Sequence, residues 1–214
     1  MNAKRIMNLW LALVFVFFSA NSATCQDANE SQKKAESLKL SVGEPLPAFE
    51  SIDDMGRVWK STDHIGKSVV VMYFYPGDFT GGCMKQAEAY RDGLDKIESN
   101  CALVVGVSGD EVATHKLFRE TFGLKHALLA DSKGELANML GVPIKKGGRV
   151  TAVTPDRKWL LDPDGNRILL ERPVTLGRWT IVIDRDGKLA SMREVKNPAN
   201  DIEEVLKIVE GLPK

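Results

Sequence analysis

Apolar residues in this chain gather in short runs that alternate with amphipathic segments. Two runs are nearly continuous, residues 68–75 (SVVVMYFY) and 102–108 (ALVVGVS), and both are rich in β-branched side chains. Such runs are typical of central strands that are covered on both faces. Between them, residues 82–99 carry apolar side chains at spacings of three and four, which predicts a helix with one buried face. The pattern therefore predicts a buried sheet whose strands are joined by helices.

The alternation continues to the end of the chain. Residues 49–61 predict a hairpin that turns at Asp54, Met55 and Gly56. Further helices are expected over 111–122, 133–140 and 200–210, and further strands over 126–131 and on either side of the turn at 185–187. Strands that alternate with helices, followed by a closing hairpin and helix, indicate an α/β fold with a central sheet flanked by helices.

One stretch interrupts this order. Residues 145–176 contain two short apolar runs on either side of a turn sequence at 162–165, Asp-Pro-Asp-Gly. We expect an inserted β-hairpin just before the last strands. The favoured interpretation is a surface decoration, and the alternative is a lid or a surface that docks a partner.

The N-terminus has a different composition from the rest. Lys4 and Arg5 precede an apolar run at 9–18, and small polar residues follow. This layout predicts a secretory signal peptide over 1–24 and export to the periplasm or another extracytoplasmic location. The polar residues 25–38 are then a flexible linker to one folded domain over 39–214. The alternatives are an uncleaved membrane anchor and a lipid attached to Cys25.

Charge and cysteine content reduce the number of function classes that fit the chain. Acidic and basic residues balance at 29 each, which argues against a general nucleic-acid binder because that function needs an excess of basic residues. The chain has three cysteines, too few for a disulfide framework, and no C-x-x-C pair. A thioredoxin-type redox pair and a zinc knuckle are therefore excluded, and we expect neither a metal nor a cofactor.

Cys83 is the strongest candidate for a catalytic residue. It follows a strand, a proline at Pro76 and two glycines, and it falls at the start of the predicted helix. The free N–H groups and the dipole at a helix N-terminus favour the reactive thiolate. Thr80 places a hydroxyl on the same loop, and Pro76 fixes the loop conformation. The alternative is that Cys83 is an inert buried residue of the core.

The pattern Pro76-x-x-x-Thr80-x-x-Cys83 resembles the active-site motif of the peroxiredoxins. The segment FYPGDFT resembles sequences of the Q-type, or bacterioferritin comigratory protein, subfamily. Four further segments also resemble the family: VGEPLPAFE, VVGVSGD, LLADSKGELANMLGV and RWTIVIDRDGK. The resemblance covers most of residues 40–212. It implies a thioredoxin-like fold and the thiol-dependent reduction of hydrogen peroxide and organic hydroperoxides.

The resemblance also assigns roles by position. Cys83 is then the peroxidatic cysteine, whose thiolate attacks the peroxide and becomes a sulfenic acid. Thr80 hydrogen-bonds the thiolate and the peroxide, Pro76 shields the sulfenate, and Arg178 pairs with the thiolate. Four positions depart from the family pattern: Gly81 for proline, Met84 for threonine, Gln86 for glutamate, and Glu88 for the resolving cysteine.

Without a cysteine at position 88, we expect a one-cysteine mechanism in which thioredoxin or another external thiol reduces the sulfenate. Cys101 begins a predicted strand and is expected to be buried for packing; a resolving role for Cys101 or Cys25 is the alternative. The enzyme is expected to be a monomer or a homodimer. A non-catalytic or weakly active redox or binding module with a thioredoxin fold is the main competing function. A Cys-His hydrolase is a further one, because the chain also has three histidines: His64, His115 and His126.

Overall fold

The computed structural model describes residues 40–213, so the predicted signal peptide and linker lie outside the described residues. The described elements, in chain order, are β1 (Glu50–Asp53), β2 (Val58–Lys60), the short 3₁₀ helix η1 (Ser61–Asp63), β3 (Val69–Phe74), α1 (Gly81–Glu98), β4 (Ala102–Ser108), α2 (Val112–Phe122), β5 (Ala127–Ala130), α3 (Glu135–Met139), β6 (Ile144–Thr151), β7 (Leu169–Leu176), β8 (Trp179–Ile183), β9 (Leu189–Glu194) and α4 (Asp201–Glu210). Within this part of the chain, no helix is both long and apolar enough to cross a bilayer.

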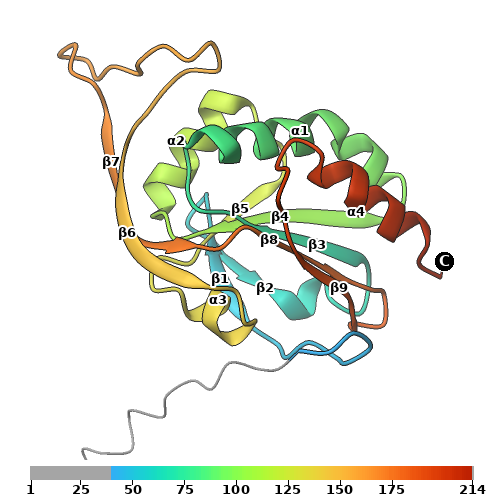
Figure 1. Ribbon diagram of the computed structural model, residues 1–214. Helices are drawn as coiled ribbons and strands as arrows, with labels where there is room; N and C mark the ends of the chain where they lie inside the picture. Colours follow the sequence, from blue (N-terminus) through green and yellow to red (C-terminus); the bar gives the residue numbers. More distant parts are fainter. Residues whose placement is uncertain (1–39, 214) are drawn as a thin grey trace, which may run out of the picture. The chain divides into compact units, whose positions relative to one another are not determined.

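A seven-stranded mixed sheet runs through the domain in the order β2-β1-β5-β4-β3-β8-β9. The strands β3, β4 and β5 are parallel, whereas β8 pairs antiparallel with β3, and β9 with β8. The helices α1 and α2 connect successive parallel strands. Because such crossovers are right-handed, and the strands advance in one direction, both helices lie on the same face of the sheet (Figure 1).

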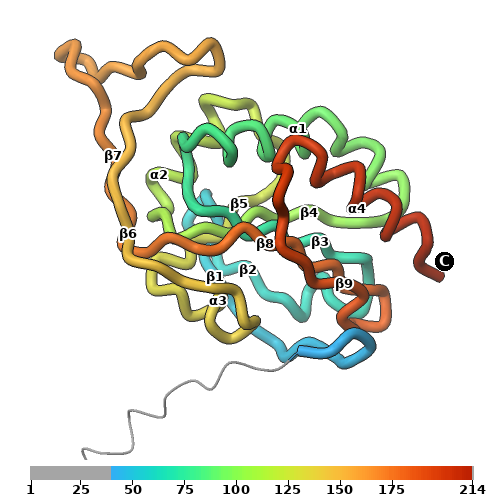
Figure 2. The backbone as a smooth tube through the Cα atoms, viewed as in Figure 1, coloured from blue at the N-terminus to red at the C-terminus, as the bar shows by residue number. Residues whose placement is uncertain are grey.

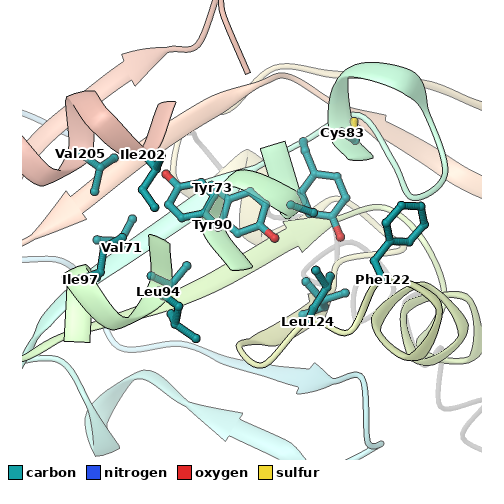
Figure 3. Packing of buried hydrophobic residues seen from close by; sticks show 14 of the residues in the cluster. Val71, Tyr73, Cys83, Tyr90, Leu94, Ile97, Phe122, Leu124, Ile202 and Val205 are labelled. Atoms are coloured by element: carbon teal, nitrogen blue, oxygen red, sulfur yellow. The ribbon is translucent and has the colours of Figure 1, made fainter. Parts of the chain in front are cut away.

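The buried strand β3 divides the core between the two faces. Its side chains alternate: Val71 and Tyr73 pack with α1, α2 and α4, whereas Val70 and Met72 pack with α3 on the other face. All six residues of β3 are buried, as expected for a central strand covered on both sides. Figure 3 shows the first of these cores, with Cys83 at the edge where α1 begins.

The inserted hairpin predicted at 145–176 is confirmed. Its strands β6 and β7 form a separate two-stranded antiparallel ribbon, which we call the arm, with its tip at residues 152–168 (Figure 2). The base of the arm leads directly into β8. At the tip, Ala152 and Val153 are buried in the same core cluster as Cys83 and Met84. The arm is therefore packed against the domain, although most of its strand residues are exposed.

Most predicted elements appear within a few residues of their expected limits, because their apolar patterns match the buried faces. The prediction that Cys101 is buried is wrong. The strand β4 begins one residue later, at Ala102, and Cys101 is exposed. Its backbone has a positive φ of 54°, at the point where the chain reverses after α1, and the side chain consequently faces solvent.

Candidate active site

The loop between β3 and α1 places Cys83 on the first turn of α1. Tyr75 continues the pairing of β3, because its N–H donates to the Val107 carbonyl at 3.0 Å. The chain then turns through Phe79, which has a left-handed φ of 57°, and α1 begins after Thr80. The N–H groups of the first helical turn have no partner within the helix and point toward the loop. This end of α1 therefore favours negative charge at Cys83.

The thiol of Cys83 has an arginine beside it. Cys83 is only 1% exposed, and its sulfur accepts a hydrogen bond from Nη2 of Arg178 at 3.1 Å. Arg178 lies just before β8, the antiparallel neighbour of β3. A guanidinium at this distance stabilises a sulfur anion, as the helix N-terminus does. The structure thus brings together Cys83 and Arg178, which are 95 residues apart in the chain.

Gln86 connects this arginine to a buried carboxylate. Its side-chain oxygen accepts from Arg178 Nη1 at 2.6 Å, and its amide nitrogen donates to Oδ2 of Asp201 at 2.7 Å. Gln86 and Asp201 are both fully buried. The amide therefore uses one acceptor and one donor to fix the guanidinium in the plane that meets the thiol.

Asp201 is the centre of this network. Besides Gln86, the hydroxyls of Tyr90 and Thr180 each donate to its Oδ2 at 2.8 Å. Its second oxygen forms an ion pair with Arg193. A fully buried carboxylate needs this number of donors to offset the loss of its hydration. We call the group formed by Arg178, Gln86 and Asp201 the thiol network.

Thr80 and Pro76 flank the thiol on the loop. The Thr80 hydroxyl donates to the Gly77 carbonyl at 2.8 Å. Its single proton is therefore used within the loop, and its lone pairs remain for a donor such as a peroxide O–H. Pro76 is half-buried, and its carbonyl accepts from Nη1 of Arg172 at 3.3 Å.

A second buried network lies behind the same loop. Asp78 accepts from the Tyr75 hydroxyl at 2.8 Å and pairs with His115 Nδ1 at 2.8 Å. Asp110 accepts from the backbone N–H of Asp78 at 2.8 Å and pairs with Arg172 Nε at 3.2 Å. We call the group formed by Asp78, Asp110, His115 and Arg172 the loop network.

Two groups of the loop network, Asp110 and His115, have raised pKa values. Burial raises the pKa of Asp110, and repulsion from the Asp78 carboxylate raises it further. Burial lowers the pKa of His115, but the charge and hydrogen bond of Asp78 outweigh burial, so this pKa is raised overall. Both ring nitrogens of His115 face acceptors, because Nε2 lies 3.2 Å from the Leu129 carbonyl. The imidazolium form satisfies both acceptors.

None of the histidines is arranged as a base for Cys83. His115 is bound to Asp78, and His64 stacks on Trp59 at 4.8 Å between ring centroids. His126 lies 2.7 Å from the Tyr73 hydroxyl, and burial and Arg119 lower its pKa to about 4. These positions give no support to a Cys-His hydrolase.

Sequence reasoning missed four charged residues of these networks: Asp78, Asp110, Asp201 and Arg172. Asp201 begins an amphipathic helix with further acidic residues in its first turn, so its local sequence gives no sign that the side chain is buried. Arg172 lies in the arm among exposed charged residues, and its sequence context gives no sign of burial. Gln86 was noticed only as a departure from glutamate, but it links Arg178 to Asp201.

Comparisons with known proteins show the family to which the chain belongs. The AhpC/TSA family matches residues 42–192. The chain is 31% identical over 196 residues to a chloroplastic peroxiredoxin Q of Populus jackii, covering 91% of this chain and 80% of the relative. It is 33% identical over 183 residues to a chloroplastic peroxiredoxin Q of Suaeda salsa, covering 85% and 73%. Because these relatives are named chloroplastic, they do not support the predicted export to the periplasm.

Solved structures show the same fold. A peroxidoxin of Mycobacterium tuberculosis superposes with a TM-score of 0.64 at 24% identity, covering 82% of this chain and 99% of that one. A PrxQ mutant of Xylella fastidiosa gives a TM-score of 0.63 at 23% identity, with coverages of 81% and 98%. The predicted thioredoxin-like fold is thus confirmed, and the chain belongs to the AhpC/TSA family, as a thiol-dependent peroxidase of the peroxiredoxin Q type.

Proposed function

We propose that Cys83 is the peroxidatic cysteine and that it reduces hydrogen peroxide and organic hydroperoxides. The thiolate sulfur attacks one peroxide oxygen, so an S–O bond forms as the O–O bond breaks. The second oxygen leaves as hydroxide or alkoxide and takes up a proton, giving water or an alcohol. Cys83 is left as a sulfenic acid. The observation that carries this proposal is the 3.1 Å contact between the buried sulfur and Arg178.

The other predicted site residues have distinct roles in this proposal. Arg178 holds the thiolate and stabilises the charge that develops on the peroxide. The Thr80 oxygen accepts the peroxide O–H, since its own proton is given to Gly77. Pro76, at the end of the strand, limits access of water to the sulfenic acid. These roles agree with the positions of the side chains around the first turn of α1.

The proposed mechanism uses one cysteine and an external thiol, such as thioredoxin. Cys101 follows the far end of α1, an 18-residue helix, so about 25 Å separates it from Cys83. A disulfide needs Cα atoms within about 7 Å. At the position of the missing resolving cysteine, Glu88 instead pairs with Arg157 of the arm at 3.2 Å. Cys25 lies outside the described residues, and its use as a resolving thiol is the alternative.

For the N-terminus, we propose that residues 1–24 are a targeting segment and 25–38 a linker to the peroxidase domain. The chloroplastic names of the relatives favour an organelle as the destination. Any membrane attachment is assigned to this segment, and the domain is proposed to act as a monomer or a homodimer. Determining the N-terminus of the protein isolated from its source tests the cleavage, and gel filtration tests the assembly.

The activity is tested by stopped-flow measurement of the peroxide reaction. The intact protein should react with hydrogen peroxide at least a thousand-fold faster than free cysteine and give a sulfenic acid that dimedone traps. Cys83→Ser should abolish the reaction, whereas the control Cys101→Ser should leave it unchanged. Loss of activity in the control, or a reaction as slow as that of free cysteine, would contradict the proposal. Mass spectrometry after oxidation shows whether Cys83 has paired with another cysteine.

A further inference from the structure

Arg172 is a buried charged residue on a strand of the arm that is mostly exposed. Its neighbours on β7, Glu171 and Pro173, are exposed, but Arg172 is only 9% exposed. Its side chain leaves the arm and reaches the loop that precedes α1. Burial of a guanidinium is costly unless each donor finds an acceptor, so the contacts of this side chain indicate what holds it there.

The acceptors of Arg172 are mainly backbone groups of the loop. Nη1 donates to the Pro76 carbonyl at 3.3 Å, and Nη2 donates to the Asp78 carbonyl at 3.4 Å. Nε pairs with Asp110 at 3.2 Å. Asp110 in turn accepts from the N–H of Asp78 at 2.8 Å. The ion pair therefore holds both the carbonyl and the N–H of residue 78.

Gly77 makes this contact possible. A Cβ atom at position 77 would lie 2.2 Å from Cζ of Arg172, closer than atoms can approach. The carbonyl of Gly77 has its own donor, the Thr80 hydroxyl at 2.8 Å. Three successive carbonyls of the loop are thus held, the outer two by Arg172 and the middle one by Thr80.

The restraint matters because Gly81, the first residue of α1, has no side chain to stiffen the junction between the loop and the helix. Gly81 stands where the resembled family has proline, and apart from its chain neighbours and the backbone of α1 no atom lies within 4 Å of a Cβ built there. Neither ring closure nor packing therefore fixes this residue. The orientation of the Thr80 hydroxyl depends on the residues before it, which Arg172 holds, whereas the first turn of α1 is closed by the hydrogen bond from the Met84 N–H to the Thr80 carbonyl at 2.9 Å.

We propose that Arg172 is a positioning residue for the peroxidase reaction: the inserted arm clamps the active-site loop through this one buried side chain. The inference rests on the proposed role of Cys83. Arg172 contacts neither the sulfur nor Arg178 in this arrangement. Its loss should therefore disturb the alignment of the peroxide by Thr80 and leave the nucleophilicity of the thiolate largely unchanged.

The test compares two reactions of the same thiol in the full-length protein. Arg172→Ala should lower the second-order rate with hydrogen peroxide by about 10- to 100-fold, since small misplacements carry costs of this size. The rate of alkylation by iodoacetamide should change by less than about three-fold, because alkylation needs a thiolate but no aligned peroxide. Arg149→Ala is the matched control, being an exposed arginine on the other strand of the arm, and both of its rates should equal those of the parent.

Chemical rescue separates positioning from general damage. Millimolar guanidinium should restore much of the peroxide rate of Arg172→Ala, since the substitution leaves room for the ion beside Asp110. Arg172→Met fills that space and should show the same loss without rescue. Arg172→Lys keeps the positive charge and disturbs the packing less than the other two substitutions do. Its rate with peroxide should lie between those of the parent and of Arg172→Ala.

The outcomes are distinct. A peroxide rate of Arg172→Ala and of Arg172→Lys within two-fold of the parent overturns the inference, provided that Cys83→Ser is inactive. The inference is also overturned if Arg172→Ala loses its reactions with peroxide and with iodoacetamide equally, or if its alkylation becomes faster and guanidinium does not restore the peroxide rate. In either case the arm would only maintain the fold. If Cys83→Ser keeps its peroxide rate, the proposed function itself fails, whatever the Arg172 variants do.

Discussion

Two arginines lie on the segment from β7 to the start of β8, and both act at the beginning of α1, but they differ in what they touch. Arg178 donates to the sulfur of Cys83 and, through Gln86, connects it to Asp201. Arg172 donates to backbone carbonyls of the loop and to Asp110. The comparison separates two requirements of a reactive cysteine: charge at the sulfur, and a fixed loop around it.

The two networks also differ in their balance of charge. The thiol network has one buried carboxylate, Asp201, which pairs with Arg193 and accepts from three neutral groups. The loop network holds two carboxylates, Asp78 and Asp110, and repulsion from Asp78 adds to burial in raising the pKa of Asp110. The loop network therefore needs two cations, which are Arg172 and His115. Of these, His115 can lose its proton as pH rises through its raised pKa. Dependence on pH is expected to come from the loop network.

The largest effect should follow the loss of Arg178. Arg178→Met removes the donor to the sulfur and the charge beside the peroxide, so the peroxide rate should fall by at least about 100-fold. Alkylation by iodoacetamide should fall as well, in contrast to the Arg172 variants. Stopped-flow kinetics of both reactions give this comparison. A peroxide rate within ten-fold of the parent would mean that the helix N-terminus alone activates Cys83.

A smaller effect is expected at the far end of the thiol network. Asp201→Asn preserves the shape but removes the charge that pairs with Arg193, so the free energy of unfolding should fall by about 3 kcal/mol. Urea unfolding measures this change. Glu204→Gln is the control: Glu204 is the exposed partner of Arg193, and its loss should cost less than about 1 kcal/mol. Equal losses in the two variants would show that burial of Asp201 contributes little.

The smallest effect is a dependence of stability on pH. The pKa of His115 is raised in the folded protein by Asp78, so the folded state binds a proton more tightly than the unfolded chain. The stabilisation is complete below a pH of about 6.5 and is lost as pH rises through the raised pKa. His115→Gln should remove this loss. Urea unfolding at several pH values from 6 to 9 tests it.

The control for this measurement is His64→Gln, because His64 stacks on Trp59 outside the loop network. That variant should keep the decline in stability that the parent shows above pH 6.5. If it loses the decline and His115→Gln retains it, the assignment of the pH dependence to the loop network is incorrect.

The pattern of the chain was sufficient to predict most elements because local periodicity determines which faces are buried. β3 and β4 were recognised from continuous apolar runs, and the arm from its turn at 162–165. Cys101 was misplaced because a one-residue difference at a chain reversal decides between core and solvent. Asp201 and Arg172 were missed because they look like surface residues in their local sequence.

By itself, the sequence determined the family, the alternation of strands and helices, and the motif of Pro76, Thr80 and Cys83. These features depend on neighbouring residues, so short stretches of the chain are enough to specify them. Only the tertiary structure decided which charges meet at the start of α1. Arg178 comes from the residue before β8, Asp201 from α4 and Arg172 from the arm. Ion pairs between such distant segments form only when the packing of the sheet and helices brings them together.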